Sequence, residues 1–273
     1  MPELPEVEVL RRSLEPRLVG RRVERVEVLA PALREPLARR PLAALAGRRF
    51  VALGRRAKYL LADLEGGRTL VVHLGMSGRL TLVPGGSPRE VHEHLAFHLD
   101  SGERLRLRDP RRFGLAYAAP TAALASDPHL AHLGVEPLSP EFDGARLAAA
   151  AAGRRGPVKS FLLDGRAIAG VGNIYACEAL FRAGIRPDRS VARLAPARWE
   201  RLAGALVEVL EEAIRAGGTT LNDFADGAGR EGLFQVALSV YGRTGEPCPR
   251  CGRPVRRREL AGRGTYDCPG CQR

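Results

Sequence analysis

The chain has 273 residues, enough for two domains that each bury a core. Lys and Arg outnumber Asp and Glu by 43 to 31, the formal net charge is +12, and the sequence pI is about 10.4. No apolar run is long enough to span a bilayer and no secretory leader is evident, so we exclude a membrane protein and expect a soluble, intracellular one. Because the basic residues are dispersed rather than set on one amphipathic helix, nucleic acid is the expected partner.

The N-terminal segment carries the first helix signals. Pro5 suits the first turn of a helix, where its missing N–H costs nothing. Glu6 and Glu8 place negative charge where the helix dipole favours it. Apolar residues at helical spacing from Val7 to Leu18 predict a helix over residues 5–18.

The residue after Met1 gives this helix a possible chemical use. Removal of Met1 would leave a secondary amine on Pro2, and an α-amino pKa near 7.7–8.0 keeps about a tenth of it as free base at neutral pH. Such an amine attacks an aldehyde-like carbon to give an iminium ion, and Glu3 beside it can donate or accept a proton. An ordinary capped N-terminal helix explains the same residues.

From Gly20 the apolar period changes to two, and short alternating segments separated by turns predict a β-sandwich. The expected strands lie around Val23–Val28, Phe50–Leu53, Tyr59–Leu64, Leu70–Leu74, Leu80–Val83, Leu95–Leu99, Leu105–Leu107 and Leu115–Tyr117. In the segment Arg104–Arg108 we expect the leucines to face the core and the three arginines to face solvent or phosphate.

After Pro120 the pattern becomes helical. The predicted helices cover residues 121–133, 144–152, 157–164, 174–183 and 196–216. Cys177 falls within one of them and is expected to be a small buried hydrophobe. We therefore place a domain boundary near residues 120–135.

The most specific motif is a pair of C-x₂-C knuckles near the C-terminus. Cys248, Cys251, Cys268 and Cys271 have the spacing of a tetrahedral Cys₄ site, which predicts one structural Zn²⁺ rather than a disulfide framework. With four thiolates the metal is coordinatively closed and is not the catalyst. Between the knuckles we expect a hairpin with Arg263 at its tip, reaching either a phosphate or only solvent.

Six further signals occur in order along the chain: Pro2–Glu8, Arg55–Leu61, His73–Gly78, Asp109–Gly114, Gly170–Tyr175 and the terminal cysteine knuckles. Taken together, these segments resemble those of the bacterial formamidopyrimidine-DNA glycosylases, bifunctional enzymes of base-excision repair. The resemblance runs from end to end. It implies an α+β fold with an N-terminal β-sandwich, a helix–two-turns–helix domain and a C-terminal zinc finger. The corresponding domains are residues 1–125, 126–240 and 241–273, with damaged double-stranded DNA bound between them.

The resemblance also implies a role for each matching residue. Pro2 would attack the sugar C1′ and expel the damaged base through a Schiff-base intermediate, with Glu3 as general acid or base. Lys58 would assist β-elimination, and Arg263 would take part in δ-elimination. The expected DNA contacts are His92, Arg111, Arg154, Lys159 and Asn173, together with Met76 and Phe113.

A base inside a duplex must be flipped out before a protein nucleophile can reach its sugar, and wedge side chains usually fill the space it leaves. Met76 lies in a Gly-Met-Ser-Gly turn, and Arg111 and Phe113 lie in a second turn. These three resemble the intercalating residues of the family: Arg111 would hydrogen-bond the orphaned base, while Met76 and Phe113 would support the stack.

The chain departs from the family pattern at two positions, Val9 in place of Thr or Ser and Arg154 in place of Lys. The main hypothesis is a glycosylase and lyase for 8-oxoguanine and formamidopyrimidines, acting as a monomer in the bacterial cytoplasm near the nucleoid. Two alternatives are an endonuclease VIII-type enzyme for oxidised pyrimidines and a non-catalytic zinc-ribbon DNA binder. The opening Pro2–Glu8 and the segment Asp223–Gln235, which resembles a lesion-capping loop, favour the purine enzyme.

Overall fold

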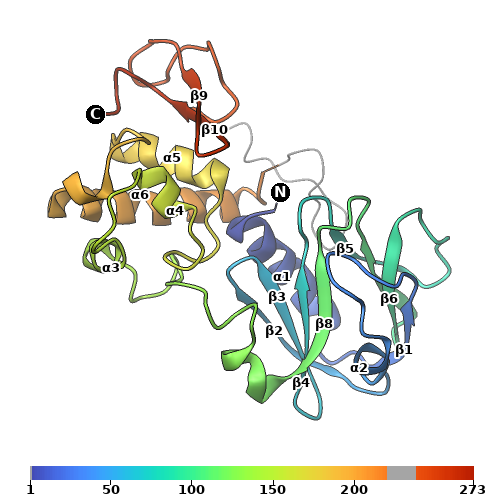
Figure 1. The fold of residues 1–273 in the computed structure, drawn as a ribbon. Coiled ribbons are helices and arrows are strands. Elements are labelled where there is room, and N and C mark those ends of the chain that lie inside the picture. Colours follow the sequence, from blue (N-terminus) through green and yellow to red (C-terminus); the bar gives the residue numbers. More distant parts are fainter. Residues whose placement is uncertain (1, 220–237) are drawn as a thin grey trace. The chain divides into compact units, whose positions relative to one another are not determined.

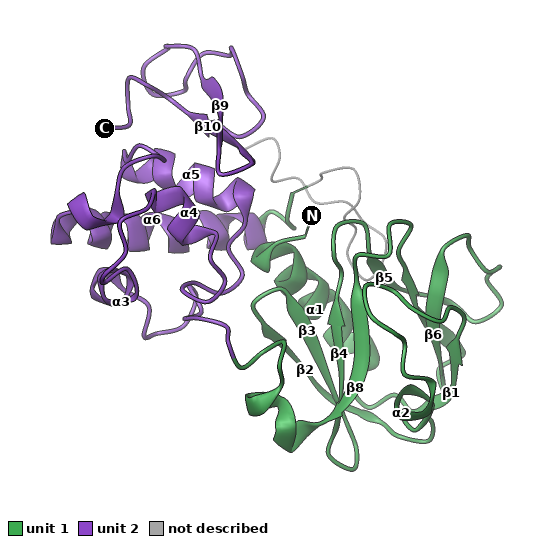
Figure 2. Ribbon diagram, in the orientation of Figure 1, with its two compact units in different colours: residues 1–131, 216–235 green, residues 132–215, 236–273 purple. Residues whose placement is uncertain are grey.

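The computed structural model describes residues 2–219 and 238–273 (Figure 1). The chain divides into two compact units, residues 1–131 with 216–235 and residues 132–215 with 236–273 (Figure 2). Among the described helices, none is long and apolar enough to cross a membrane.

The first unit contains two four-stranded antiparallel sheets, as a β-sandwich requires. One sheet has the order β1-β6-β7-β5 and the other β2-β3-β4-β8. The strands are β1 (Val23–Val28), β2 (Phe50–Arg56), β3 (Tyr59–Leu64), β4 (Arg68–His73), β5 (Arg79–Pro84), β6 (Glu93–Leu99), β7 (Glu103–Arg108) and β8 (Leu115–Pro120). Each expected strand is therefore present, with its ends shifted by a few residues.

Helix α1 (Leu4–Leu18) packs its apolar face into the core of this unit. Its apolar stripe, including Leu10 and Leu14, is completely buried and joins a cluster that continues through Phe50 and Phe97. The helix thereby fixes the N-terminal residues against the sandwich.

Two expectations for this unit were wrong. The face that carries Arg104, Arg106 and Arg108 is covered rather than open: Arg104 is buried and pairs with Glu93, and Arg106 is half-buried between Glu90 and Glu93, while Arg108 stays partly exposed. Residues 121–133 do not form an α-helix: a 3₁₀ turn (Thr121–Ser126) ends before Pro128, which disfavours helical backbone at the residue ahead of it. A short helix that was not expected, α2 (Arg39–Ala43), follows β1.

The second unit is helical, with a terminal hairpin. Its helices are α3 (Gly144–Ala150), α4 (Val158–Leu162), α5 (Asn173–Ala183) and α6 (Pro196–Arg215), and its strands are β9 (Arg256–Leu260) and β10 (Arg263–Asp267). Phe161 of α4 meets Trp199 of α6 edge to face, with ring centroids 5.6 Å apart. Cys177 is fully buried, as expected, in a second cluster with Phe181 and Cys268 that joins α5 to the hairpin.

The α+β architecture predicted for the chain is thus confirmed: a sandwich with an N-terminal helix, a helical region and a cysteine-bearing hairpin. The division into domains at residues 125 and 240 stays a proposal.

Candidate active site

The N-terminal residues are buried and held by a reciprocal capping box. Pro2 is buried, and Glu3, which is 2% exposed, is the N-cap of α1. The Glu3 N–H donates to Glu6 Oε2 at 2.7 Å, while the Glu3 side chain accepts from the backbone of Glu6. Pro2 and Glu3 are therefore fixed at the positive end of the α1 dipole.

Glu6 does more than close this cap. Its other oxygen, Oε1, accepts hydrogen bonds from the N–H and the hydroxyl of Thr219 at 3.0 and 2.9 Å. Sequence reasoning treated Glu6 only as a first-turn acid, because nothing in the local pattern links it to a residue more than 200 positions away.

A charged cluster lies one turn further along α1. Glu8 accepts hydrogen bonds from Arg11, Arg12 and Arg55 at 2.8–3.3 Å. Burial raises the pKa of Glu8, but the hydrogen bonds from Arg11 and Arg12 and the charges of Arg11 and Arg55 outweigh it and leave the pKa below its ordinary value. Glu8 thus stays ionised and ties β2 to α1 through Arg55.

Lys58 is half-buried in the two-residue turn between β2 and β3. The turn requires a left-handed backbone at Ala57 (φ 52°), and Arg55 Nη1 supports it by donating to the Ala57 carbonyl at 2.8 Å.

Beside the effect of burial, the positive charge of Lys58 contributes to a low pKa of His73. Burial first, then the charges of Arg34, Lys58 and His129, lower the pKa of His73 to about 3. His73 is therefore neutral, and its Nδ1 accepts the Gly75 N–H at 3.0 Å.

The structure brings the three expected wedge residues together on two touching turns. Met76 (37% exposed) and Phe113 (44% exposed) are among only five exposed large hydrophobic residues in the described ranges. Gly75, at φ +63°, makes the close approach possible, because a Cβ there would lie 2.4 Å from the Phe113 carbonyl carbon. The guanidinium of Arg111 stacks on the Phe113 ring, with Cζ 4.9 Å from the centroid.

A buried carboxylate, which the sequence analysis did not single out, joins these turns. Asp109 is 0% exposed; its Oδ1 accepts from Ser77 Oγ at 2.6 Å and its Oδ2 from the Gly114 N–H at 2.7 Å. Ser77 Oγ in turn accepts the Arg111 N–H at 3.2 Å. Asp109 therefore fixes the backbone beneath Met76, Arg111 and Phe113. The signal was present in the Asp-Pro-Arg-Arg-Phe-Gly segment, but only the exposed members of that segment suggested a function.

His92 is exposed beside this group, and its backbone also has a positive φ of 68°. Its carbonyl accepts the Asp109 N–H at 3.0 Å, and His94 Nε2 lies 2.9 Å from the Asp109 carbonyl. Asp109 thus connects His92 with the two wedge turns.

In the second unit, Arg154 is exposed and already paired. Its Nη1 donates to Asp164 at 2.7 Å, and its guanidinium lies 5.6 Å from the centroid of the Phe161 ring. Asp164 consequently has a pKa below its ordinary value, chiefly because of the hydrogen bond from Arg154. The side chain is pre-oriented on the surface, and its contact with DNA stays a prediction.

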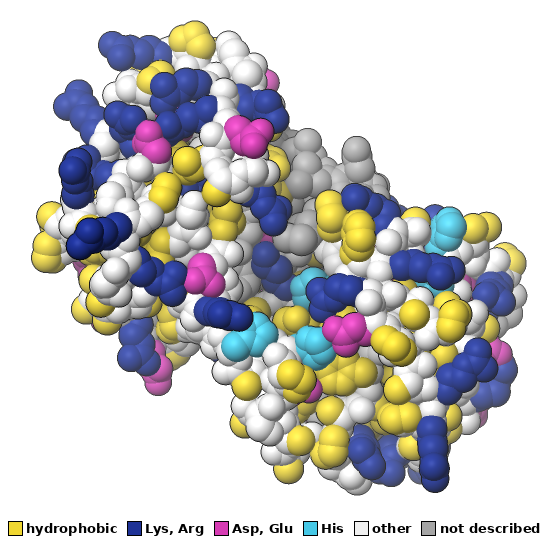
Figure 3. All heavy atoms as spheres, in the orientation of Figure 1, with side chains coloured by type: hydrophobic (Ala, Val, Ile, Leu, Met, Phe, Trp, Pro, Cys, Tyr) yellow, Lys and Arg dark blue, Asp and Glu magenta, His cyan; other side chains and the backbone are white. Residues whose placement is uncertain are grey.

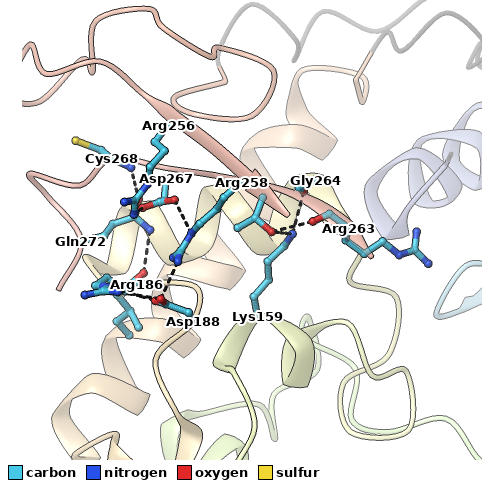
Figure 4. A network of polar contacts seen from close by, with 12 residues as sticks. Lys159, Arg186, Asp188, Arg256, Arg258, Arg263, Gly264, Asp267, Cys268 and Gln272 are labelled. Atoms are coloured by element: carbon cyan, nitrogen blue, oxygen red, sulfur yellow. Dashed lines mark hydrogen bonds and ion pairs between the residues drawn. The ribbon is translucent and has the colours of Figure 1, made fainter. Parts of the chain in front are cut away.

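Lys159 and Asn173 converge on one carbonyl of the terminal hairpin, that of Gly264. Figure 4 shows the contact from Lys159. Lys159 Nζ donates to the Gly264 oxygen at 3.0 Å and to Thr265 Oγ1 at 2.8 Å, and Asn173 Nδ2 donates to the same Gly264 oxygen at 2.9 Å. Lys159 is only 1% exposed, unlike the surface lysine expected of a backbone contact. Arg263, next to Gly264, is exposed at the start of β10.

The four knuckle cysteines form a cluster that fits zinc. Their Sγ atoms all lie within 4.8 Å of one another, with 3.8 Å between Cys248 and Cys271 and 3.4 Å between Cys251 and Cys268. A tetrahedral site with Zn–S bonds of about 2.3 Å has an S–S edge of about 3.8 Å, so the cluster is close to the required size. The protein has one structural zinc site, as expected, and it supplies rigidity rather than reaction chemistry.

The proposed capping loop, Asp223–Gln235, lies outside the residues that the structure describes.

Three family models match the chain in succession. The formamidopyrimidine-DNA glycosylase N-terminal domain matches residues 1–116, the formamidopyrimidine-DNA glycosylase H2TH domain residues 133–225, and the zinc finger found in FPG and IleRS residues 245–273. The formamidopyrimidine-DNA glycosylase of Halorhodospira halophila is 53% identical, with 100% of both chains covered.

Two solved structures of the same family resemble this chain over nearly its whole length. The MutM (Fpg) protein of Thermus thermophilus is 46% identical, with a TM-score of 0.88 over 99% of this chain and 98% of that one. Lactococcus lactis Fpg, in a complex with DNA that contains an abasic site, is 33% identical, with a TM-score of 0.92 over 99% of both chains. The chain therefore belongs to the formamidopyrimidine-DNA glycosylase family.

Proposed function

We propose that this protein is a base-excision repair DNA glycosylase and AP lyase that removes oxidised purines from duplex DNA, with Pro2 as its nucleophile. The observation that carries the proposal is the buried Pro2–Glu3 terminus, fixed at the N-terminal end of α1 by Glu6. An ordinary helix cap needs no such burial of two acidic side chains.

The first step is capture of the damaged nucleotide. Lys and Arg side chains are spread over the visible surface of both units (Figure 3), which suits contacts to phosphates. The proposed DNA contacts are His92, Arg111, Arg154 and Asn173. Lys159, expected among them, is instead buried against Gly264 and Thr265 of the hairpin. Met76 and Phe113 fill the space left by the flipped nucleotide, because two apolar side chains held out on rigid turns can stack on bases.

The second step is attack on the sugar. Once Met1 is removed, the Pro2 nitrogen forms a bond to C1′, and the bond from C1′ to the base breaks with its electron pair leaving on the base. The base takes up a proton, the sugar ring opens, and the product is an iminium ion on Pro2. The positive end of the α1 dipole favours the unprotonated amine before attack, and Glu3 transfers protons at the sugar.

Two eliminations follow. Loss of a C2′ proton, assisted by Lys58, breaks the C3′–O bond and releases the 3′ phosphate. Loss of a C4′ proton then breaks the C5′–O bond and releases the 5′ phosphate, whose charge Arg263 stabilises. The iminium ion makes both protons acidic, because it accepts the electrons that each C–H bond leaves behind.

Comparison of substrates tests this proposal. We expect excision of 8-oxoguanine opposite cytosine to exceed excision of thymine glycol opposite adenine by roughly tenfold or more. The variant Glu3→Gln should be inactive on both. Preference for thymine glycol would favour the endonuclease VIII-type alternative. If neither base is excised from its duplex, the non-catalytic binder is favoured. We further propose that the protein acts as a monomer on chromosomal DNA in the cytoplasm.

A further inference from the structure

Hydrogen bonds hold the tip of the hairpin that carries Arg263. Ala261 (φ 51°) and Gly262 (φ 70°) turn the chain between β9 and β10, and Arg263 is the first residue after the turn. The Arg263 side chain is exposed, whereas the next residue, Gly264, is held by Lys159, as Figure 4 shows. The direction in which Arg263 points therefore depends on what holds Gly264 and Thr265.

A buried ammonium group holds both of them. Lys159 Nζ reaches the Gly264 carbonyl and the Thr265 hydroxyl, and Thr265 Oγ1 also lies 3.1 Å from the Arg263 carbonyl. Thr265 is completely buried. Charge-assisted hydrogen bonds in a site shielded from water are the strong ones, so this contact restrains the tip more than an exposed pair would. The second donor to Gly264, Asn173, comes from the first turn of α5.

A separate network holds the same hairpin away from the tip. Arg258 of β9 donates to Asp188 at 2.7 Å and to Asp267 at 3.2 Å, and Arg256 donates to Asp267 at 2.7 Å (Figure 4). Gln272 joins the Cys268 N–H to the Ile185 carbonyl. Attachment of the hairpin to the helices therefore does not depend on Lys159 alone.

We propose that Lys159 is a positioning residue for Arg263: it sets the hairpin tip so that δ-elimination follows β-elimination, and it does so without touching DNA. Its near-complete burial and its hydrogen bonds to Gly264 and Thr265 support this role over a phosphate contact. The inference rests on the proposed function, in which Arg263 stabilises the 5′ phosphate as the C5′–O bond breaks. Lys159 takes no part in proton or bond transfer.

The test is the end group left on cleaved DNA. After β-elimination alone the 3′ end carries an unsaturated aldehyde, and after both eliminations it carries a phosphate. The variant Lys159→Met keeps most of the side-chain volume and removes the charge. We expect it to raise the ratio of aldehyde to phosphate ends by roughly tenfold, because a strong charge-assisted contact is lost at the tip. Borohydride trapping on Pro2 should stay within about twofold of the parent rate, because that step does not use the hairpin tip.

Two further variants keep the test decisive. Thr265→Val removes one acceptor of Lys159 without removing a charge, and should shift the product ratio in the same direction by a smaller factor. Asp188→Asn weakens the other network on the same hairpin, and should lower the melting temperature without changing the ratio. If Lys159→Met fails to fold, the pair Thr265→Val and Asp188→Asn still separates a tip effect from general loosening.

The variant Arg263→Gln separates failure of the inference from failure of the proposed function. If it accumulates aldehyde ends while folded Lys159→Met and Thr265→Val keep the parent ratio, the positioning role is wrong and the proposed function stands. If Arg263→Gln itself keeps the parent ratio, the role of Arg263 in δ-elimination fails, and the inference fails with it. Equal loss of trapping and of both eliminations in Lys159→Met would also overturn the positioning role.

Discussion

Thr219 donates two hydrogen bonds to a single carboxylate oxygen of Glu6, one from its backbone and one from its hydroxyl, at 3.0 and 2.9 Å. The other oxygen of that carboxylate accepts the Glu3 N–H. One buried carboxylate therefore links the residue beside the proposed nucleophile to the end of the described segment that follows α6.

Loss of the Thr219 hydroxyl should lower both the stability of the protein and its rate of excision. Thr219→Val is nearly isosteric and removes one donor from a buried carboxylate, so we expect the free energy of unfolding to fall by about 1–3 kcal/mol. Urea denaturation measures the change, and single-turnover excision of 8-oxoguanine should slow in parallel. Thr219→Ser keeps the hydroxyl and should resemble the parent. If Thr219→Val has the same free energy of unfolding and the same excision rate as the parent, the hydroxyl contact with Glu6 has no role.

Asp109 should matter for the duplex more than for the chemistry. In Asp109→Asn the amide group would face either the Gly114 N–H or the Ser77 hydroxyl, so the two wedge turns lose one of their shared anchors. We expect excision of 8-oxoguanine from duplex DNA to slow by about tenfold to a hundredfold, the equivalent of about 1.5–3 kcal/mol. Cleavage at an abasic site in single-stranded DNA should change little, because no base has to be displaced.

The exposed Asp100→Asn, in the loop after β6, serves as the matched control for Asp109→Asn and should leave both rates unchanged. If Asp109→Asn slows the single-stranded reaction as much as the duplex reaction, the carboxylate supports the fold generally and not the wedge.

Removal of zinc should disorder the terminal hairpin. The short strands β9 and β10 share a small core that includes Cys248 and Cys268, and structural Zn²⁺ sites of this kind contribute about 10–16 kcal/mol of binding free energy. We expect a strong chelator to release about one Zn²⁺ per chain and to abolish the formation of 3′-phosphate ends. Cys251→Ser should do the same, whereas Cys177→Ser should retain the metal. Unchanged end products from metal-free protein would contradict a structural role for the site.

His73 should make the protein sensitive to acid. Its pKa is lowered from 6.5 to about 3, so between these values the unfolded chain binds a proton that the folded chain does not. Stability contributed by neutral His73 is therefore full above pH 6.5 and falls as the pH decreases toward 3, by at most about 1.4 kcal/mol per pH unit. His73→Asn, which can still accept the Gly75 N–H, should show a shallower loss of stability between pH 7 and 4.5. The exposed His92→Asn is the control, and equal slopes for the parent and His73→Asn would contradict the assignment.

Local patterns predicted most of the elements because each has a strong periodic signal. Helix α1 and strands β2 to β8 have apolar residues at the spacing that their buried faces require, and the cysteine spacing alone indicated the metal site. The errors came where a pattern was weak or where tertiary pairing overrode it. Alternation placed the arginines of β7 on the face away from the core, but the buried Glu93 lies in the same sheet and pairs with Arg104 and Arg106, so this face is covered rather than solvated.

For a similar reason, the sequence predicted the exposed residues of the site but not the buried groups that hold them in place. Exposed residues in distinctive motifs, such as Met76, Arg111 and Phe113, could be singled out from sequence. The groups that hold them could not, because the Glu6–Thr219 and Lys159–Gly264 contacts join residues far apart in the chain. A buried lysine was also indistinguishable by sequence from a surface lysine that contacts phosphate.

The central claim is that an unblocked Pro2 amine makes the bond to deoxyribose. Borohydride reduction during the reaction with a duplex that contains 8-oxoguanine opposite cytosine tests it most directly. With protein whose N-terminus is verified as Pro2, we predict a stable protein–DNA adduct, and peptide mapping should place the bond on the Pro2 nitrogen. Protein that keeps Met1 should form no adduct. Excision by protein that retains Met1, or an adduct on any other residue, would contradict the mechanism.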